Sequence, residues 1–154
     1  TSAKPKIANY EFTTLKPNLG IVRYKDFNTF VVSDIPGIIK GASKGKGLGH
    51  HFLRHIERNS ILVFLVSCES QNIDKKFNIL VDELRKYNKE LLNKEKLLVV
   101  TKCDLLGKDD IGDLKSNMKL KSLNIDVHFI SSVTAYGIET LKDIMWKKLN
   151  IQSH

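Results

Sequence analysis

The sequence predicts an α/β protein in which a mostly parallel β-sheet lies between two layers of helices. Two observations predict this fold. Short runs of strand-forming residues alternate with longer segments that carry apolar residues at helical spacing, and two of the strand-like runs are continuously apolar. Continuously apolar strands are typical of a parallel sheet that is buried on both faces. The 154 residues suit a single domain, so residues 1–154 are treated as one unit.

The first third of the chain contains a predicted antiparallel hairpin. Residues 19–24 and 30–34 are short β-rich runs, and the turn-like segment Lys25-Asp26-Phe27-Asn28 joins them. A glycine-dense segment covers residues 37–49, and residues 52–56 then place apolar side chains at helical spacing.

The rest of the chain predicts three strands, each followed by a helix. The apolar runs at residues 61–66 and 97–100 predict buried strands, and residues 127–130 predict the last strand. A more polar helix is expected over residues 110–123. The apolar stripes of the other two helices are Phe77, Leu80, Val81, Leu84, Leu91 and Leu92, and then Ile138, Leu141, Met145 and Leu149.

The composition indicates the cellular compartment of the protein more clearly than its function. No apolar run approaches the roughly 20 residues of a membrane span, and residues 1–10 lack an apolar signal region, so a cytoplasmic protein is expected. Cys68 and Cys103 lack metal-ligand spacing and are expected to be free thiols in a reducing compartment. The net charge of +8 comes mainly from lysine. That excess is compatible with contact to RNA and equally with an A+T-rich genome.

Four short segments at or near the expected strand ends carry the candidate functional residues. Ligands of parallel α/β sheets bind at the carboxyl ends of the strands, so segments at these ends are expected to converge on one site. The segments are Phe12-Thr13-Thr14, Asp34-Ile35-Pro36-Gly37, Thr101-Lys102-Cys103-Asp104 and Ser131-Ser132-Val133.

These segments resemble the motifs of P-loop GTPases, which are D-x-P-G, [NT]-K-x-D and S-[AS]-x in this order. A narrower resemblance, to the Obg family of the TRAFAC class, is carried by KPKIANYEFTTLKPNLG at residues 4–20 and by DIPGIIKGASKGKGLGHHFLRHIER at residues 34–58. The resemblance covers essentially the whole chain. It implies a partial GTP-binding domain with a three-layer, P-loop NTPase-like fold.

The resemblance implies a guanine site formed by two loops. Asp104 would accept hydrogen bonds from N1–H and the exocyclic amino group of guanine, and adenine lacks that donor pair. Lys102 would lay its methylene stem along the base. Ser131, Ser132 and Val133 would form the other wall. Thr101 replaces the asparagine usual in the family, and a hydroxyl offers fewer hydrogen-bonding sites than an amide. The expected ligands are GTP and GDP.

The resemblance also implies a magnesium-dependent switch. Asp34 would hold Mg²⁺ through a water, Thr14 would ligate it directly in the GTP state, and the Gly37 N–H would contact the γ-phosphate. Many GTPases place a glutamine after this glycine, but Ile38 occupies the position here, as in the Obg family. Turnover is therefore expected to be slow or partner-dependent, and no residue is identified as the catalytic base.

The glycines Gly41, Gly45, Gly47 and Gly49 would suit a plain flexible surface loop, and the resemblance implies that they form a second switch segment. His51 and His55 lie four residues apart on a predicted helix, but no Glu or Cys joins them, which disfavours a metal site there.

The family's phosphate loop, G-x-P-x-x-G-K-S, does not occur in the sequence. The first strand of the domain, expected mid-sheet between the strand ending near Asp34 and the one ending near Ser67, is missing as well. This chain alone is therefore expected to bind GTP weakly or not at all and not to hydrolyse it.

Two functions remain open at this point. The first is a GTPase, expected to be monomeric, that acts as a conformational timer; the resemblance implies a role in large-ribosomal-subunit assembly or stress control. The alternative is a non-catalytic ribosome- or RNA-binding module with a relic nucleotide site. The intact set of Asp34, Lys102 and Asp104 favours the first.

Overall fold

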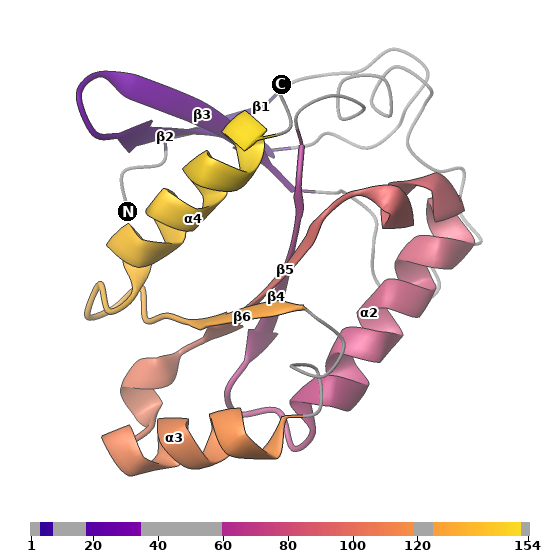
Figure 1. The fold of residues 1–154 in the computed structure, drawn as a ribbon, viewed down its shortest axis with the longest axis vertical. Helices are drawn as coiled ribbons and strands as arrows, with labels where there is room; N and C mark the ends of the chain where they lie inside the picture. The colour runs from indigo at the N-terminus through magenta and orange to yellow at the C-terminus, as the bar shows by residue number, and fades with distance from the viewer. Residues whose placement is uncertain (1–3, 8–17, 35–59, 119–124, 152–154) are drawn as a thin grey trace.

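The computed structural model describes residues 4–7, 18–34, 60–118 and 125–151 (Figure 1). Within these ranges it confirms the predicted α/β class, with six strands and three α-helices in the described part of the chain. The strands form two three-stranded sheets, and no helix of the described residues is long and apolar enough to cross a membrane.

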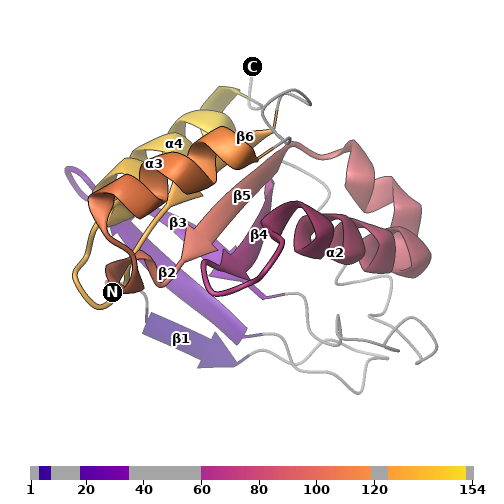
Figure 2. The same cartoon turned by 90° about the horizontal axis from the view of Figure 1, so that it is seen from below.

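The N-terminal sheet is antiparallel and has the order β1-β2-β3 (Figure 2). The predicted hairpin is confirmed: β2 (Asn18–Tyr24) pairs with β3 (Asn28–Ser33), with Val22 opposite Phe30. A further strand that was not predicted, β1 (Lys4–Ile7), pairs with the outer edge of β2. Its sequence, KPKI, has no alternating apolar pattern, and a proline is tolerated because β1 is an edge strand.

The second sheet is parallel and has the order β4-β5-β6. It consists of β4 (Leu62–Ser67), β5 (Lys96–Thr101) and β6 (Asp126–Phe129), so all three predicted strands are confirmed. The register of the first two strands places Ser67 opposite Thr101. Their carboxyl ends therefore lie at the same edge of the sheet.

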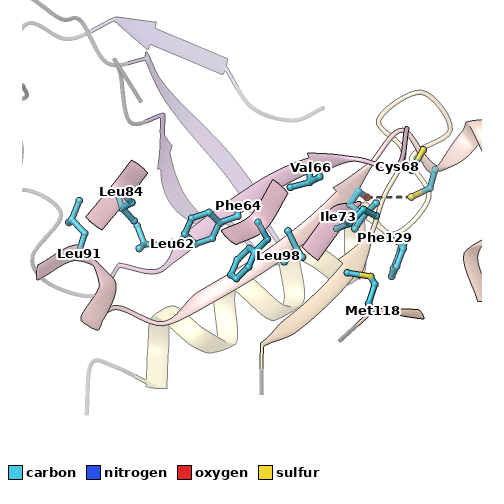
Figure 3. Close-up of a cluster of buried hydrophobic side chains, with 13 residues drawn as sticks. Leu62, Phe64, Val66, Cys68, Ile73, Leu84, Leu91, Leu98, Met118 and Phe129 are labelled. Carbon is cyan, nitrogen blue, oxygen red and sulfur yellow. Dashed lines mark hydrogen bonds between the residues drawn. The ribbon is translucent and has the colours of Figure 1, made fainter. Parts of the chain in front are cut away.

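Helices cover both faces of the parallel sheet, as a three-layer fold requires. On one face, α2 (Ile73–Asn88) and a following 3₁₀ turn (Lys89–Asn93) build the larger core (Figure 3). In this core, Phe64 and Phe77 meet edge to face with ring centroids 5.0 Å apart. On the other face, α4 (Ile138–Ile151) buries Leu141 against Leu97 and Val99 of β5.

The central strand β5 shows why its sequence is continuously apolar. Leu97, Leu98, Val99 and Val100 are all completely buried. Leu98 and Val100 belong to the core beneath α2, and their alternating neighbours belong to the core beneath α4. A strand with helices on both sides has no face on which to place a polar side chain.

The polar helix is shorter than predicted. It was expected over residues 110–123, but α3 spans Lys108–Asn117 and Met118 follows it in an extended conformation. The Met118 side chain is buried in the core beneath α2, and turning out of the helix gives it access to that core. Residues 119–124 lie outside the described part of the chain.

The hairpin is attached to α4. The Tyr24 and Trp146 rings stack with centroids 5.2 Å apart, and the Phe30 ring lies 6.4 Å from that of Trp146. The Tyr24 hydroxyl also donates a hydrogen bond to the Asp143 carboxylate. Figure 1 shows the helix alongside the hairpin.

In the described part of the chain, no hydrogen-bonded ladder joins the two sheets. Four apolar residues of β3 and β4 remain exposed, namely Val31, Val32, Val63 and Leu65.

Candidate nucleotide-binding site

The loop after β5 begins with a reversal of the chain at Lys102. This residue adopts a left-handed conformation, with φ of 62° and ψ of 31°, and a short 3₁₀ turn (Cys103–Leu105) follows. The turn is tied to the residue after β6, because the buried Cys103 donates its backbone N–H to the carbonyl of Ile130, at 3.0 Å. The anchor directs Asp104 outward at the carboxyl edge of the sheet, where its side chain is exposed.

The loop after β6 is organised by Ser131, which is completely buried. Its backbone N–H donates to the Tyr136 carbonyl at 3.0 Å, and its hydroxyl oxygen accepts from the Thr134 N–H at 3.1 Å. The following Ser132 and Val133 are exposed, and Val133 retains 81 % of its accessible surface. One buried serine therefore holds the loop while its two neighbours remain available for a ligand.

Gly137 closes this loop before α4 begins. Its φ is +73°, and a Cβ atom at this position would lie only 2.4 Å from the Phe129 carbonyl oxygen. Both the backbone conformation and the space therefore require glycine. Ala135, two residues earlier, also has a positive φ, of 64°.

The two loops meet through a direct hydrogen bond. The Ser131 hydroxyl donates to Oδ1 of Asp104 at 2.9 Å. No hydrogen bond to Oδ2 of Asp104 is found within the described ranges, and Oδ1 keeps a second lone pair. A carboxylate that is oriented by one neutral donor and otherwise faces outward can accept further hydrogen bonds from a ligand.

Residues at the end of β4 contact Lys102 from the other side. The Cys68 N–H donates to the Thr101 carbonyl at 3.0 Å, and the Cys68 thiol donates to the Lys102 carbonyl at 3.2 Å. The Lys102 ammonium forms an ion pair with Glu69, with 3.2 Å between Nζ and Oε2. Because both side chains are more than half exposed, the pair contributes at most about 1 kcal/mol, and a ligand could displace it readily.

Both cysteines are free, as predicted. Burial raises the pKa of the Cys68 thiol and that of the Cys103 thiol. A raised pKa keeps the thiol protonated, so each can act as a weak hydrogen-bond donor to a backbone carbonyl. These side chains therefore support the loop between β5 and the 3₁₀ turn.

The predicted metal and phosphate residues are only partly within the described chain. Phe12, Thr13, Thr14, Ile35, Pro36 and Gly37 lie outside it. Asp34 is described: it follows β3 directly, is exposed, and its carbonyl accepts a hydrogen bond from the Ser33 hydroxyl at 3.0 Å.

Comparison with known proteins agrees with this geometry. The model of a family described as 50S ribosome-binding GTPase matches residues 1–102. The chain is 55 % identical over 153 residues to GTPase Obg of Flavobacterium psychrophilum, and 58 % identical over 150 residues to GTPase Obg of Flavobacterium johnsoniae. It is also 56 % identical over 150 residues to GTPase Obg of Parabacteroides distasonis.

The chain belongs to the Obg family of GTPases. The alignments include 99 %, 97 % and 97 % of this chain but 46 %, 45 % and 38 % of those relatives, in the order above. The chain thus spans less than half the length of the curated Obg proteins it matches.

The match to the family model ends at Lys102, so it does not include the contact between Asp104 and Ser131. That contact is a separate observation of the structure. In this Obg-family chain the two observations agree, because the predicted base-binding carboxylate and the predicted serine wall lie within hydrogen-bonding distance of each other.

The predicted Mg²⁺ residue that the structure describes, Asp34, has the type of ligand atom that Mg²⁺ prefers. Mg²⁺ prefers oxygen ligands, keeps several waters and needs only one or two protein groups. Asp34 offers one exposed carboxylate, and no group of three or more His, Cys, Asp or Glu that could enclose a metal occurs among the described residues. One exposed carboxylate is compatible with Mg²⁺, which needs only one or two protein ligands.

The residues that support Lys102 were not predicted from the sequence. Cys68 and Glu69 follow a predicted buried strand, so their place at a strand end could have indicated a role in the site. Tyr136 and Thr134, which hydrogen-bond to Ser131 through backbone groups, carried no signal because such contacts do not depend on side-chain type.

Proposed function

We propose that the gene product carrying this chain binds GTP and GDP and hydrolyses GTP slowly as a conformational switch. The single observation that carries this proposal is the hydrogen bond of 2.9 Å from the Ser131 hydroxyl to the Asp104 carboxylate. It supports a site in which the two carboxylate oxygens of Asp104 face outward beside the loop at residues 131–133.

Guanine recognition follows from the chemistry of that carboxylate. Asp104 accepts hydrogen bonds from N1–H and from the exocyclic amino group of the base, while the Ser131 hydroxyl fixes its orientation. An adenine base would leave the carboxylate without these donors, and sites of this type reject such a misfit by about 10⁴–10⁵-fold.

Lys102 and the wall at residues 131–133 complete the base site in this proposal. The methylene stem of Lys102 packs along one face of the base, which requires its ammonium to exchange Glu69 for the nucleotide. That exchange is easy because the ion pair is exposed to solvent. Thr101, Cys103, Ser132 and Val133 contribute as members of the two loops.

The switch depends on the third phosphate. Asp34 would hold Mg²⁺ through a water and Thr14 would be a direct ligand, with Phe12, Thr13, Ile35, Pro36 and Gly37 in the surrounding loops. Mg²⁺ neutralises phosphate charge when it is bound. The apolar Ile38 cannot orient a water, so hydrolysis is slow without a partner.

The family description, 50S ribosome-binding GTPase, supports a ribosomal partner. We propose that the switch acts on the large ribosomal subunit, in its assembly or in stress control, and that the protein is a cytoplasmic monomer. The alternative of a non-catalytic RNA-binding module remains testable, since it predicts salt-dependent RNA binding that does not respond to GTP or GDP.

The test is isothermal titration of the gene product with GDP and with ADP in the presence of Mg²⁺. The proposal predicts that GDP binds at least about 10³-fold more tightly than ADP. Equal affinities for the two nucleotides would contradict it. The 154-residue chain alone is expected to bind GTP·Mg²⁺ weakly or not at all, and an affinity of about 1 μM, worth roughly 8 kcal/mol, would contradict that expectation.

A further inference from the structure

The tip of the β2–β3 hairpin, residues 25–28, presents a fully exposed aromatic ring. Phe27 has a relative exposure of 105 %. The neighbouring rings of Tyr24 and Phe30 pack against Trp146 instead. An apolar ring with this exposure gains nothing from burial within its own fold, so packing does not account for a phenylalanine here.

The backbone at this position also disfavours phenylalanine. Asp26 has a φ of 56° and Phe27 a φ of 71°, and the Asn28 N–H donates to the Lys25 carbonyl at 3.2 Å. A turn whose two central residues are both left-handed favours Asn-Gly or Asp-Gly. Aspartate tolerates this conformation, whereas a bulky residue in it is an outlier. Phe27 therefore occupies the place that glycine would fit best, and neither folding nor packing benefits.

The residues that lead into the hairpin tip, Tyr24 and Lys25, contact α4. Tyr24 stacks on Trp146 with an interplanar angle of 27°. The Asp143 carboxylate accepts a hydrogen bond from the Tyr24 hydroxyl and forms an ion pair with Lys25, with 3.1 Å between Nζ and Oδ1. These contacts fix the backbone that leads into the tip, so binding of a partner at Phe27 does not need to order that part of the hairpin.

Cationic side chains lie on both sides of the hairpin near the exposed ring. Arg23 is exposed, and strand alternation places it on the face opposite to Tyr24 and α4. No ion pair to Arg23 is found within the described ranges. On the face toward α4, Lys25 and Lys147 both interact with the carboxylate of Asp143. With Arg23 and the tip residue Asp26 included, these five side chains are three cations and two carboxylates, so the net charge around the tip is +1. The chain as a whole carries a net charge of +8.

We propose that the hairpin tip binds single-stranded or looped RNA. An unpaired base stacks on the ring of Phe27, and the adjoining phosphates contact Arg23 and Lys25. Exposed aromatic rings flanked by cations are the usual means of binding unpaired nucleotides without sequence preference, and the positive charge favours RNA over an apolar protein surface. This site is separate from the nucleotide pocket and does not depend on it. RNA binding here would be one way in which the protein contacts the proposed ribosomal partner.

The experiment measures fluorescence anisotropy of a labelled single-stranded oligoadenylate of about 12 nucleotides, which is long enough for one such site. The protein is the gene product and its Phe27→Gly variant. Loss of one base–aromatic stack predicts that the variant's Kd rises by about tenfold or more. The variant should fold at least as well as the parent, because glycine suits the left-handed turn.

Three control variants separate the effects of the aromatic ring, of a glycine in the turn and of the Arg23 cation on RNA affinity. Phe27→Trp keeps a stacking surface and should bind RNA as the parent does. Asp26→Gly introduces glycine into the same turn but keeps the ring, so its affinity should not fall. Arg23→Gln should weaken binding and reduce the slope of log Kd against log salt concentration by about one.

Two results would overturn the inference. One is a Phe27→Gly variant that binds the oligoadenylate with the parent's affinity. The other is a parent protein that shows no RNA binding up to about 100 μM, the weak limit for non-specific nucleic-acid binding, which would leave the hairpin tip as a contact for another protein. GDP titrations of the same variants should be unchanged, so failure of the RNA test is distinguishable from failure of the proposed GTPase function.

Discussion

The Ser131 hydroxyl donates a hydrogen bond of 2.9 Å to the Asp104 carboxylate, joining two loops that are 27 residues apart in sequence. The serine is completely buried and the aspartate is exposed. The protein interior thus fixes the serine, and the serine in turn orients a carboxylate that faces outward. The two residues together give the candidate base site its geometry.

Ser131→Ala tests this relationship. The change removes a donor to Asp104 and an acceptor for the Thr134 N–H. We expect a loss of about 1–2 kcal/mol in the free energy of unfolding, and a fall of about tenfold in GDP affinity because Asp104 is no longer oriented. Urea unfolding and isothermal titration measure the two effects.

Ser132→Ala is the matched control, since this neighbouring serine is exposed. Its free energy of unfolding should change by no more than about 0.5 kcal/mol. If both alanine variants lost stability to the same extent, the buried Ser131 would have no special role in holding the loop.

Gly137→Ala tests whether the loop after β6 needs a glycine. The added methyl group would approach the Phe129 carbonyl oxygen to 2.4 Å at a φ of +73°. We expect the variant to lose about 3 kcal/mol of stability in urea unfolding.

The opposite exchange at Ala135, which also has a positive φ of 64°, should act in the other direction. Ala135→Gly removes a left-handed alanine and is expected to be neutral or to stabilise by up to about 1 kcal/mol. Destabilisation by both exchanges would contradict the backbone conformation described for this loop.

His128 on β6 predicts a pH dependence of stability. Burial lowers the pKa of this imidazole from its ordinary value of 6.5. The folded state therefore binds the proton less tightly than the unfolded chain. The contribution of the neutral His128 to the free energy of unfolding is therefore fully present above pH 6.5. It is lost as the pH falls from 6.5 toward the lower pKa of the folded state.

Urea unfolding of the parent and of His128→Gln on both sides of pH 6.5 measures this effect. The parent should lose more stability on acidification than the variant does. Other histidines contribute equally to both proteins, so the difference isolates His128. An equal or larger loss in the variant would exclude the imidazole as the cause.

The sequence predicts the parallel sheet well because burial on both faces leaves a strong local signal. The run at residues 97–100 predicted β5 to within one residue at each end. The strand β1 could not be predicted in the same way, since Lys-Pro-Lys-Ile forms a strand only by pairing with β2. The end of α3 was missed because Met118 leaves the helix to reach a core built from distant residues.

The candidate site was predictable where strand ends determine it. Asp104 and Ser131 were both expected at the carboxyl edge of the sheet, and the parallel pairing of β5 with β6 places them there. The ion pair between Lys102 and Glu69 was not predictable, because these residues are 33 positions apart and meet only through the register of Ser67 with Thr101.

The most direct test of the proposed function is the Asp104→Asn variant of the gene product, titrated with GDP and with xanthosine diphosphate. The asparagine oxygen can still accept from the base N1–H, but its amide group donates where guanine also donates. Xanthine carries a carbonyl at that position and can accept instead. We predict that GDP affinity falls by at least about 100-fold and that xanthosine diphosphate becomes the tighter ligand. Unchanged affinities for both nucleotides would show that Asp104 does not contact the base and would contradict the proposed function.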